Sequence, residues 1–195
     1  MSAMQSTIVS NIAGFGILAV VIYFTRQYQL FEWRLMFLLI FGIVESVAIA
    51  AYYSAVRESL SGATVFGYLL SQVIIVLVSF GLFNEWIYFD PTTIRGLANI
   101  ASFFLTMFAL YSYSGTLSVG RRWLGMITLS AMINAIANIA AKYFLKTGIP
   151  PFLYLFVEQI GLLVGGWIYV IGRGQGMKLS VKSWRIGLLQ GLFAV

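Results

Sequence analysis

The sequence contains no cysteine and no histidine, and only 9% of its 195 residues are charged. Without cysteine there is neither a disulfide framework nor a thiolate metal site. Without histidine the commonest general base and metal ligand is missing. Glycine-rich phosphate-binding motifs and clustered metal ligands are also absent from the sequence. We therefore expect neither an enzyme nor a bound cofactor or metal.

Hydrophobic residues make up 61% of the chain, and its mean hydropathy is +0.93. No ordinary soluble domain of this size has such a composition, so the sequence predicts a polytopic membrane protein. The apolar runs have the length of membrane-spanning helices, roughly 20 residues, and not the alternating pattern of a barrel, so we expect an all-α fold. The net charge of +6 comes from Lys and Arg between these runs, which indicates membrane topology and a lipid partner, with no nucleic acid.

Six apolar runs predict six full transmembrane helices, and a final short run predicts a partial seventh helix. The full helices are expected at Thr7–Phe24, Leu35–Val56, Gly62–Trp86, Thr92–Tyr111, Trp123–Phe144 and Pro151–Ile171, and the partial one from Trp184 to Val195. Four tryptophans, Trp33, Trp86, Trp123 and Trp184, fall at span ends, where their rings are expected at the membrane interface.

The stretch from Ala51 to Ala109 predicts two helices joined by a short polar turn. Within this turn, Asp90 and Pro91 favour the start of the next helix at Thr92. The segment Ser112 to Trp123 is rich in Gly and Ser and predicts a linker that divides the chain into two parts.

Several segments follow the order of one transporter repeat: YYSAV, SGATV, FGLFNEW and IRGLANI. This order resembles the EamA type of the drug/metabolite transporter superfamily. The later segment LGMITLSAMINAIANIAAKYFLKTGIPP resembles the opening helix of that family's second repeat. The chain departs from the family at Ser71-Gln72, where the family often has proline, and at Asn84, where glycine commonly precedes the acid.

The resemblance implies ten helices in two inverted five-helix repeats. Residues 1–115 would form the first repeat without its first helix, and residues 116–195 an incomplete second repeat that lacks its last two to three helices. The implied function is secondary transport by alternating access, in the export direction, of a small organic metabolite or amino-acid-like solute, with protons as a candidate coupling ion. The implied location is the plasma or inner membrane. Whether the protein forms a homodimer is left open by the resemblance.

Two alternatives stay open. A nucleotide-sugar or lipid-linked-group carrier of the same superfamily would need basic residues deep in its cavity, and Lys142 is the one candidate. A scaffold subunit without transport would instead bury its polar residues against one another. The orientation of the N-terminus in the membrane is also open. The loops on one side of the predicted helices contain seven Lys and Arg residues and those on the other side five, which places the N-terminus inside, whereas the resemblance places it outside.

Two carboxyl side chains lie within predicted spans, where a charge costs at least about 2.5 to 3.5 kcal/mol. Glu158 shares a helix face with Gly161 and Gly165, whose GxxxG spacing permits close approach of another helix. Glu45 shares its face with small residues and Tyr52. Either carboxyl is a candidate for proton exchange or substrate pairing, and the alternative is a structural acid bonded at a helix contact.

A polar stripe recurs every four residues from Ser130 through Asn134 and Asn138 to Lys142. It predicts a binding wall, with Lys142 pairing to a carboxyl or reaching the interface, and the alternative is hydrogen bonding between helices. Weaker stripes contain Tyr68, Gln72 and Ser79, and Asn99, Ser102 and Thr106, where structural bonding is favoured. The residues expected to bind substrate or line a cavity are Glu45, Tyr52, Tyr68, Gln72, Asn134, Asn138, Lys142 and Glu158.

Overall fold

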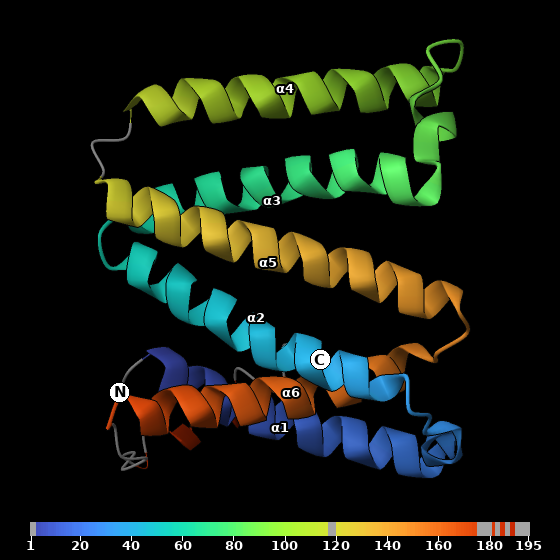
Figure 1. Ribbon diagram of the computed structural model, residues 1–195, viewed down its shortest axis with the longest axis vertical. Coiled ribbons are helices and arrows are strands. Elements are labelled where there is room, and N and C mark those ends of the chain that lie inside the picture. Colours follow the sequence, from blue (N-terminus) through green and yellow to red (C-terminus); the bar gives the residue numbers. More distant parts are fainter. Residues whose placement is uncertain (1–2, 117–119, 175–180, 182–183, 186–187, 190–195) are drawn as a thin grey trace. The chain divides into compact units, whose positions relative to one another are not determined.

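The computed structural model describes residues 3–116, 120–174, 181, 184–185 and 188–189 (Figure 1). Over the described residues the chain is all-helical, without a β-strand. The α-helices are α1 (Ala3–Phe24), α2 (Leu35–Val56), α3 (Leu60–Phe83), α4 (Ile94–Thr116), α5 (Arg121–Lys146) and α6 (Pro151–Gly172), and two 3₁₀ helices are η1 (Gln27–Leu30) and η2 (Glu85–Phe89). In the described part, six helices are long and apolar enough to cross a membrane, so the protein is a polytopic membrane protein.

The observed helices match the predicted spans, with differences at their ends. Helix α3 ends at Phe83 and not at the predicted Trp86, because Asn84 adopts a left-handed conformation with φ 54° and ψ 45°. Helix α4 continues to Thr116 and α5 begins at Arg121. The predicted linker from Ser112 to Trp123 is therefore helical over most of its described residues. The predicted partial helix from Trp184 to Val195 lies mainly outside the described residues.

The start of α4 is built by a turn at Asp90. The Asp90 carboxylate accepts hydrogen bonds from the Thr92 hydroxyl at 2.7 Å and from the Thr92 backbone N–H at 2.9 Å. Thr93 then caps the helix, because its hydroxyl accepts from the Gly96 N–H at 2.9 Å. The predicted start at Thr92 with Pro91 in the first turn is thus wrong: the turn precedes the helix, which begins at Ile94.

The two bonds from Thr92 have an electrostatic consequence for the turn. The hydrogen bond from the Thr92 hydroxyl, followed by the one from its backbone N–H, holds the pKa of the Asp90 carboxyl below its ordinary value. Glycine is required at position 96, because a Cβ there would collide with the Asp90 backbone. The Asp90 carboxylate and the contact between Gly96 and the Asp90 backbone together fix where α4 begins.

The chain forms two compact units, each described by itself: unit 1 is Met1–Ala50 with Ala141–Val195, and unit 2 is Ala51–Ala140. In unit 1, α1 and α6 lie side by side (Figure 1). Met4, Ile8 and Val170 form a buried cluster between them. These units are defined by contacts and do not test the predicted boundary between two sequence repeats at residue 116, which stays a prediction.

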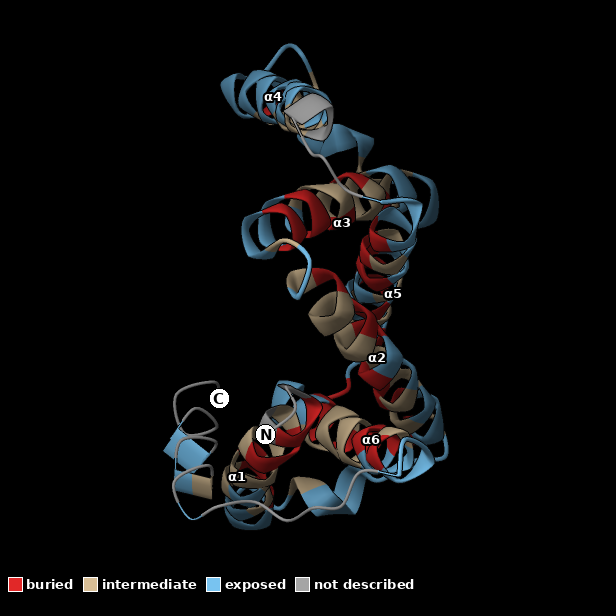
Figure 2. Ribbon diagram, turned by 90° about the vertical axis from the view of Figure 1, so that its left-hand side faces the viewer, coloured by how far each residue is buried: buried red, intermediate tan, exposed pale blue. Residues whose placement is uncertain are grey.

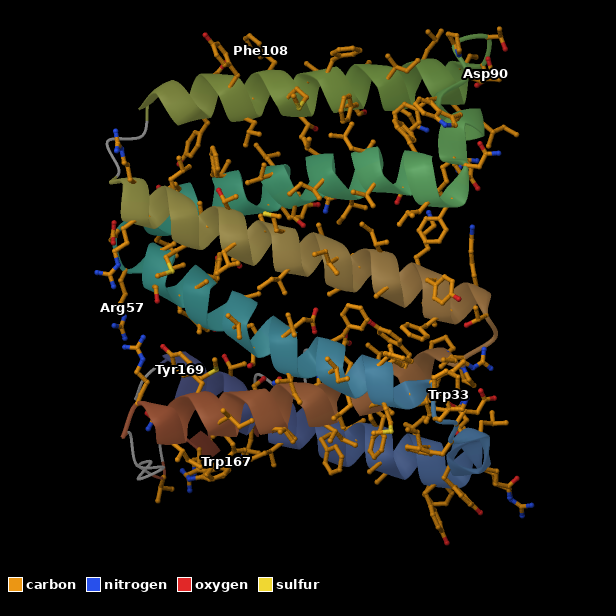
Figure 3. All side chains as sticks on the ribbon, viewed as in Figure 1. Trp33, Arg57, Asp90, Phe108, Trp167 and Tyr169 are labelled. Carbon is orange, nitrogen blue, oxygen red and sulfur yellow. The ribbon has the colours of Figure 1, made fainter. Side chains whose placement is uncertain are left out.

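In unit 2, α3, η2 and α4 form a helical hairpin, as expected for Ala51 to Ala109 (Figure 1). The Phe80 ring stacks on Trp86 at the hairpin's corner, with ring centroids 4.6 Å apart. Most of α4 is exposed, including Phe108 at 68% (Figures 2 and 3). In Figure 3, Arg57 lies just after the end of α2, and Asp90 lies in the turn before α4.

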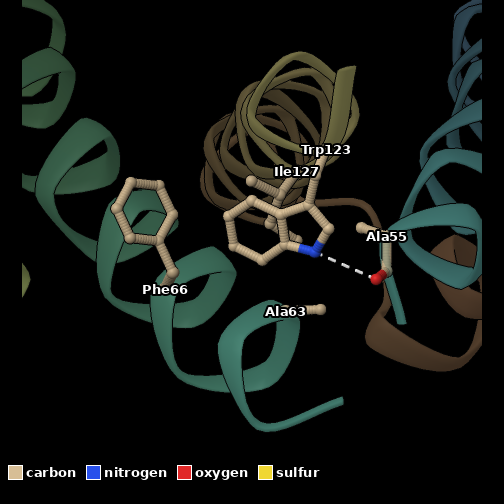
Figure 4. Packing of buried hydrophobic residues seen from close by; sticks show 5 residues of the cluster. All are labelled: Ala55, Ala63, Phe66, Trp123 and Ile127. Carbon is tan, nitrogen blue, oxygen red and sulfur yellow. Dashed lines mark hydrogen bonds between the residues drawn. The ribbon is translucent and has the colours of Figure 1, made fainter. Parts of the chain in front are cut away.

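The core of unit 2 gathers around Trp123 (Figure 4). Its indole N–H donates to the backbone oxygen of Ala55 at 3.0 Å, and its ring lies 5.9 Å from that of Phe66. We call Ala55, Ala63, Phe66, Trp123 and Ile127 the Trp123 cluster. Trp123 lies in the first turn of α5, at a span end as expected, and its side chain is fully buried against the other helices of unit 2. Trp33 and Trp86, at 71% and 61% exposed, have the exposure expected at span ends.

Candidate functional site

Glycines bring α2 and α6 into backbone contact in unit 1. A Cβ added to Gly42 would lie 2.8 Å from the Cα of Gly161, and a Cβ on Gly161 would lie 2.8 Å from the Cα of Gly42. One turn further, a Cβ on Gly165 would lie 2.9 Å from the Cβ of Ser46. Only glycine fits these positions without a shift. The close approach predicted from the GxxxG spacing at Gly161 and Gly165 is therefore confirmed.

This contact places the carboxyl groups of Glu45 and Glu158 together. The two carboxyl side chains lie close enough to interact with each other, and both residues are half-buried. Each lies within an apolar span, α2 or α6. The structure thus joins two candidate acids into one carboxyl pair.

Tyr154 extends the carboxyl pair. Its hydroxyl donates to Oε1 of Glu158 at 2.7 Å, and its side chain is buried. Tyr154 precedes Glu158 by one helical turn, so the two residues share a face of α6. The sequence analysis missed this donor, although the spacing of four residues was a usable signal. Beside Glu158 in the chain, Gln159 has a buried side-chain oxygen without a hydrogen-bond partner among the described residues.

A second polar group lies in unit 2, between α3 and α5. The side-chain amide of Asn134 donates to the hydroxyl oxygen of Ser71 at 3.2 Å. The amide of Asn138 donates to the backbone oxygen of Asn134 at 2.8 Å and to its Oδ1 at 3.1 Å. We call these three residues the amide ladder. Its two asparagines were predicted, but Ser71 was noted only as a departure from the family pattern.

The other predicted residues have varied surroundings. In unit 2, the Tyr52 hydroxyl lies 3.1 Å from that of Thr64 and its ring packs against the Trp123 cluster. Tyr68 is 64% exposed, and Gln72 is half-buried. Lys142 is half-buried in unit 1. The candidates thus belong to two separately described groups, and the prediction that they line one site stays a prediction.

The stripe on α4 is satisfied locally. The amide of Asn99 donates to the backbone oxygen of Tyr88 at 2.6 Å, and the Thr106 hydroxyl donates to that of Ser102 at 2.8 Å. These bonds match the structural role that was favoured for this stripe. The described residues contain no group of three or more potential metal-ligating side chains.

No protein-family model, curated protein or solved structure matches the chain. The resemblance to the EamA transporters is therefore a proposal, and the function is inferred from the residues of the chain. What the structure establishes is a multi-pass, all-helical membrane protein with a carboxyl pair inside two of its spans.

Proposed function

We propose that the chain belongs to an EamA-like secondary transporter of the cell membrane, which exports a small organic or amino-acid-like solute in exchange for protons. The observation that supports this best is the carboxyl pair of Glu45 and Glu158 within two apolar spans. Ionisable groups at this depth are costly and rare, and they commonly mark ion and substrate pathways.

The geometry of the pair suits the binding of a single proton. Two neighbouring carboxyls disfavour a double negative charge, so the pair can hold one proton and changes its joint charge by one when that proton leaves. The side chains are half-buried and not fully enclosed. The hydroxyl of Tyr154 supplies a further donor to Glu158. In an alternating-access cycle, a change in charge at the pair would favour one state over the other and so couple proton movement to solute movement.

A scaffold subunit is the second candidate, and the glycine contact favours it. Gly42 and Gly161 pack the helices tightly where the carboxyls meet, as expected if the pair only holds α2 to α6. The two candidates differ in what a neutral side chain would do. A transporter would lose coupling, whereas a scaffold would lose only stability.

The test uses the protein in proteoliposomes with an imposed proton gradient and a panel of radiolabelled amino acids and small metabolites. Glu45→Gln and Glu158→Gln are the variants, and Glu58→Gln, an exposed acid between α2 and α3, is the control. We expect gradient-driven transport in the native protein and the control, with at least a tenfold loss in both variants. Transport that is unchanged in both variants would remove the pair from the mechanism, and no transport of any solute by the native protein would favour a scaffold.

A further inference from the structure

One face of α5 changes from buried to exposed along its length in unit 2. Trp123, Ile127, Ser130, Asn134 and Asn138 follow one another at spacings of three or four residues, so they share this face. Trp123 and Ile127 are 0% exposed and Ser130 is 9% exposed, whereas both asparagines are exposed. The same face is therefore closed at the start of the helix and open about three turns further on.

The closed end is formed by the Trp123 cluster (Figure 4). The indole of Trp123 fills the space beside Ala63 and Phe66, and its N–H is held by the backbone oxygen of Ala55. This packing leaves no exposed surface on either Trp123 or Ile127. Nothing polar can reach the α5 face at this end without displacing the indole.

The open end has the wrong chemistry for contact with lipid. Exposed positions on the other side of the middle of α5 are apolar, as at Met132 and Ile136, with 48% and 49% exposure. These two residues lie about 160° to 200° around the helix from Asn134, at 100° per residue. Two exposed carboxamides within a membrane span would lose hydrogen bonds if they faced hydrocarbon. Asn134 and Asn138 are therefore expected to meet water or a polar ligand.

We infer that the amide ladder binds an uncharged hydrogen-bonding group of the transported solute, which enters at the end opposite the Trp123 cluster. The inference rests on the proposed function and names the substrate class. None of Ser71, Asn134 and Asn138 carries a formal charge, and carboxamides both donate and accept hydrogen bonds. An amide or hydroxyl group on the solute complements them.

Tyr68 adds an aromatic surface to the proposed solute site. It precedes Ser71 by three residues, so the two share a face of α3, and its ring is 64% exposed. An exposed ring on the α3 face that carries Ser71 suits a solute that has an apolar body and a neutral polar group. Uncharged amino-acid side chains such as those of glutamine, threonine and tryptophan combine these properties.

The native sequence has no cysteine, so single-cysteine variants can be made without removing a native thiol. Asn134→Cys and Asn138→Cys test the open face, and Met132→Cys and Ile136→Cys are matched controls on the other side of α5. Proteoliposomes are treated with a charged, membrane-impermeant methanethiosulfonate, and total thiol is measured after unfolding in detergent. We expect the two asparagine variants to react at least tenfold faster than the controls. Equal rates at all four positions would overturn a polar open face.

The ligand class is tested on Ala141→Cys, which keeps both asparagines and lies three residues beyond Asn138 on the same face of α5. Glutamine, threonine and tryptophan are each added before labelling, with glutamate and lysine as charged comparisons. We expect at least threefold slower labelling with an uncharged amino acid and no change with the charged ones. Protection by none of the uncharged probes, or by charged probes alone, would overturn the assignment. If labelling is protected but Glu45→Gln and Glu158→Gln leave transport unchanged, the proton role fails and the solute site stands.

Discussion

The carboxyl of Glu45 on α2 lies close to the carboxyl of Glu158 on α6, and the two groups interact. The pair exists because glycines let the two helices touch: Gly42 and Gly161 would each clash with the other's backbone if either gained a Cβ. Tyr154 completes the group with a bond of 2.7 Å to Glu158. The carboxyl pair of unit 1 therefore depends on the two glycines that allow the helices to touch.

Replacing Gly161 by alanine is expected to destabilise the protein. The new methyl group would collide with the backbone of Leu39 and Gly42, so α2 and α6 would have to separate at the cost typical of overpacking, about 1 to 3 kcal/mol. The free energy of unfolding in mixed detergent micelles with increasing SDS measures this effect.

The matched control is Gly16→Ala on α1 in the same unit, where an added Cβ would meet nothing within 4 Å. Because alanine favours helix more than glycine does, this control should be neutral or stabilised by up to about 1 kcal/mol. Equal destabilisation by both substitutions would contradict a tight contact at Gly161.

Replacing Tyr154 by phenylalanine removes one hydrogen bond and leaves the ring in place. The hydroxyl donates to Glu158, so the loss should cost about 0.5 to 1.5 kcal/mol of unfolding free energy. The same SDS titration measures it, with Tyr143→Phe at an exposed tyrosine as the control. A stable Tyr154→Phe protein with unchanged unfolding would show that the bond contributes nothing.

Replacing Trp123 by phenylalanine should open the core of unit 2. The variant loses the bond from the indole N–H to Ala55 and part of a fully buried ring, which together should cost about 1 to 3 kcal/mol. Trp33→Phe, at a residue that is 71% exposed, should change stability little. Thermal unfolding in detergent compares the two variants, and a similar midpoint for both would refute the packing role of Trp123.

Acid should loosen the turn before α4. The pKa of Asp90 lies below its ordinary value because the carboxylate accepts two hydrogen bonds from Thr92. The folded turn thus favours the ionised form, so its stabilisation is present at neutral pH and is lost as the pH falls through that lowered pKa. Exchange of the Thr92 amide hydrogen, corrected for its intrinsic rate, should accelerate below about pH 4 in the native protein.

The Asp90→Asn variant is the reference for this pH dependence. Asparagine cannot ionise, so protection of the Thr92 amide should be weaker at neutral pH and should not change further with acid. Loss of protection with the same pH profile in both proteins would assign the effect to another group.

Hydropathy was enough to predict the helices, because a span must be both long and apolar wherever it lies in the membrane. Both ends of α2 were predicted correctly, since Arg34 and Arg57 bound its apolar run. The end of α3 was not, because the left-handed turn at Asn84 interrupts a segment that stays apolar through Trp86. A backbone conformation of this kind leaves no trace in hydropathy.

Side-chain partners were harder to predict than spans. The position of Trp123 at the start of α5 was predicted, but its packing partners Ala55 and Phe66 lie far from it in the sequence and were not. The glycine spacing on α6 predicted a close helix contact without naming α2 as the partner. Glu45 and Glu158 were each identified by depth alone, and only the fold shows that they meet.

The central claim is that Glu45 and Glu158 act as one proton-binding pair. The most direct test compares gradient-driven transport in proteoliposomes of Glu45→Gln, Glu158→Gln and the double variant, with the amount of folded protein measured in each. If the pair acts as a unit, the double variant should lose no more activity than either single variant. Losses that multiply in the double variant, or full transport in all three, would contradict the account.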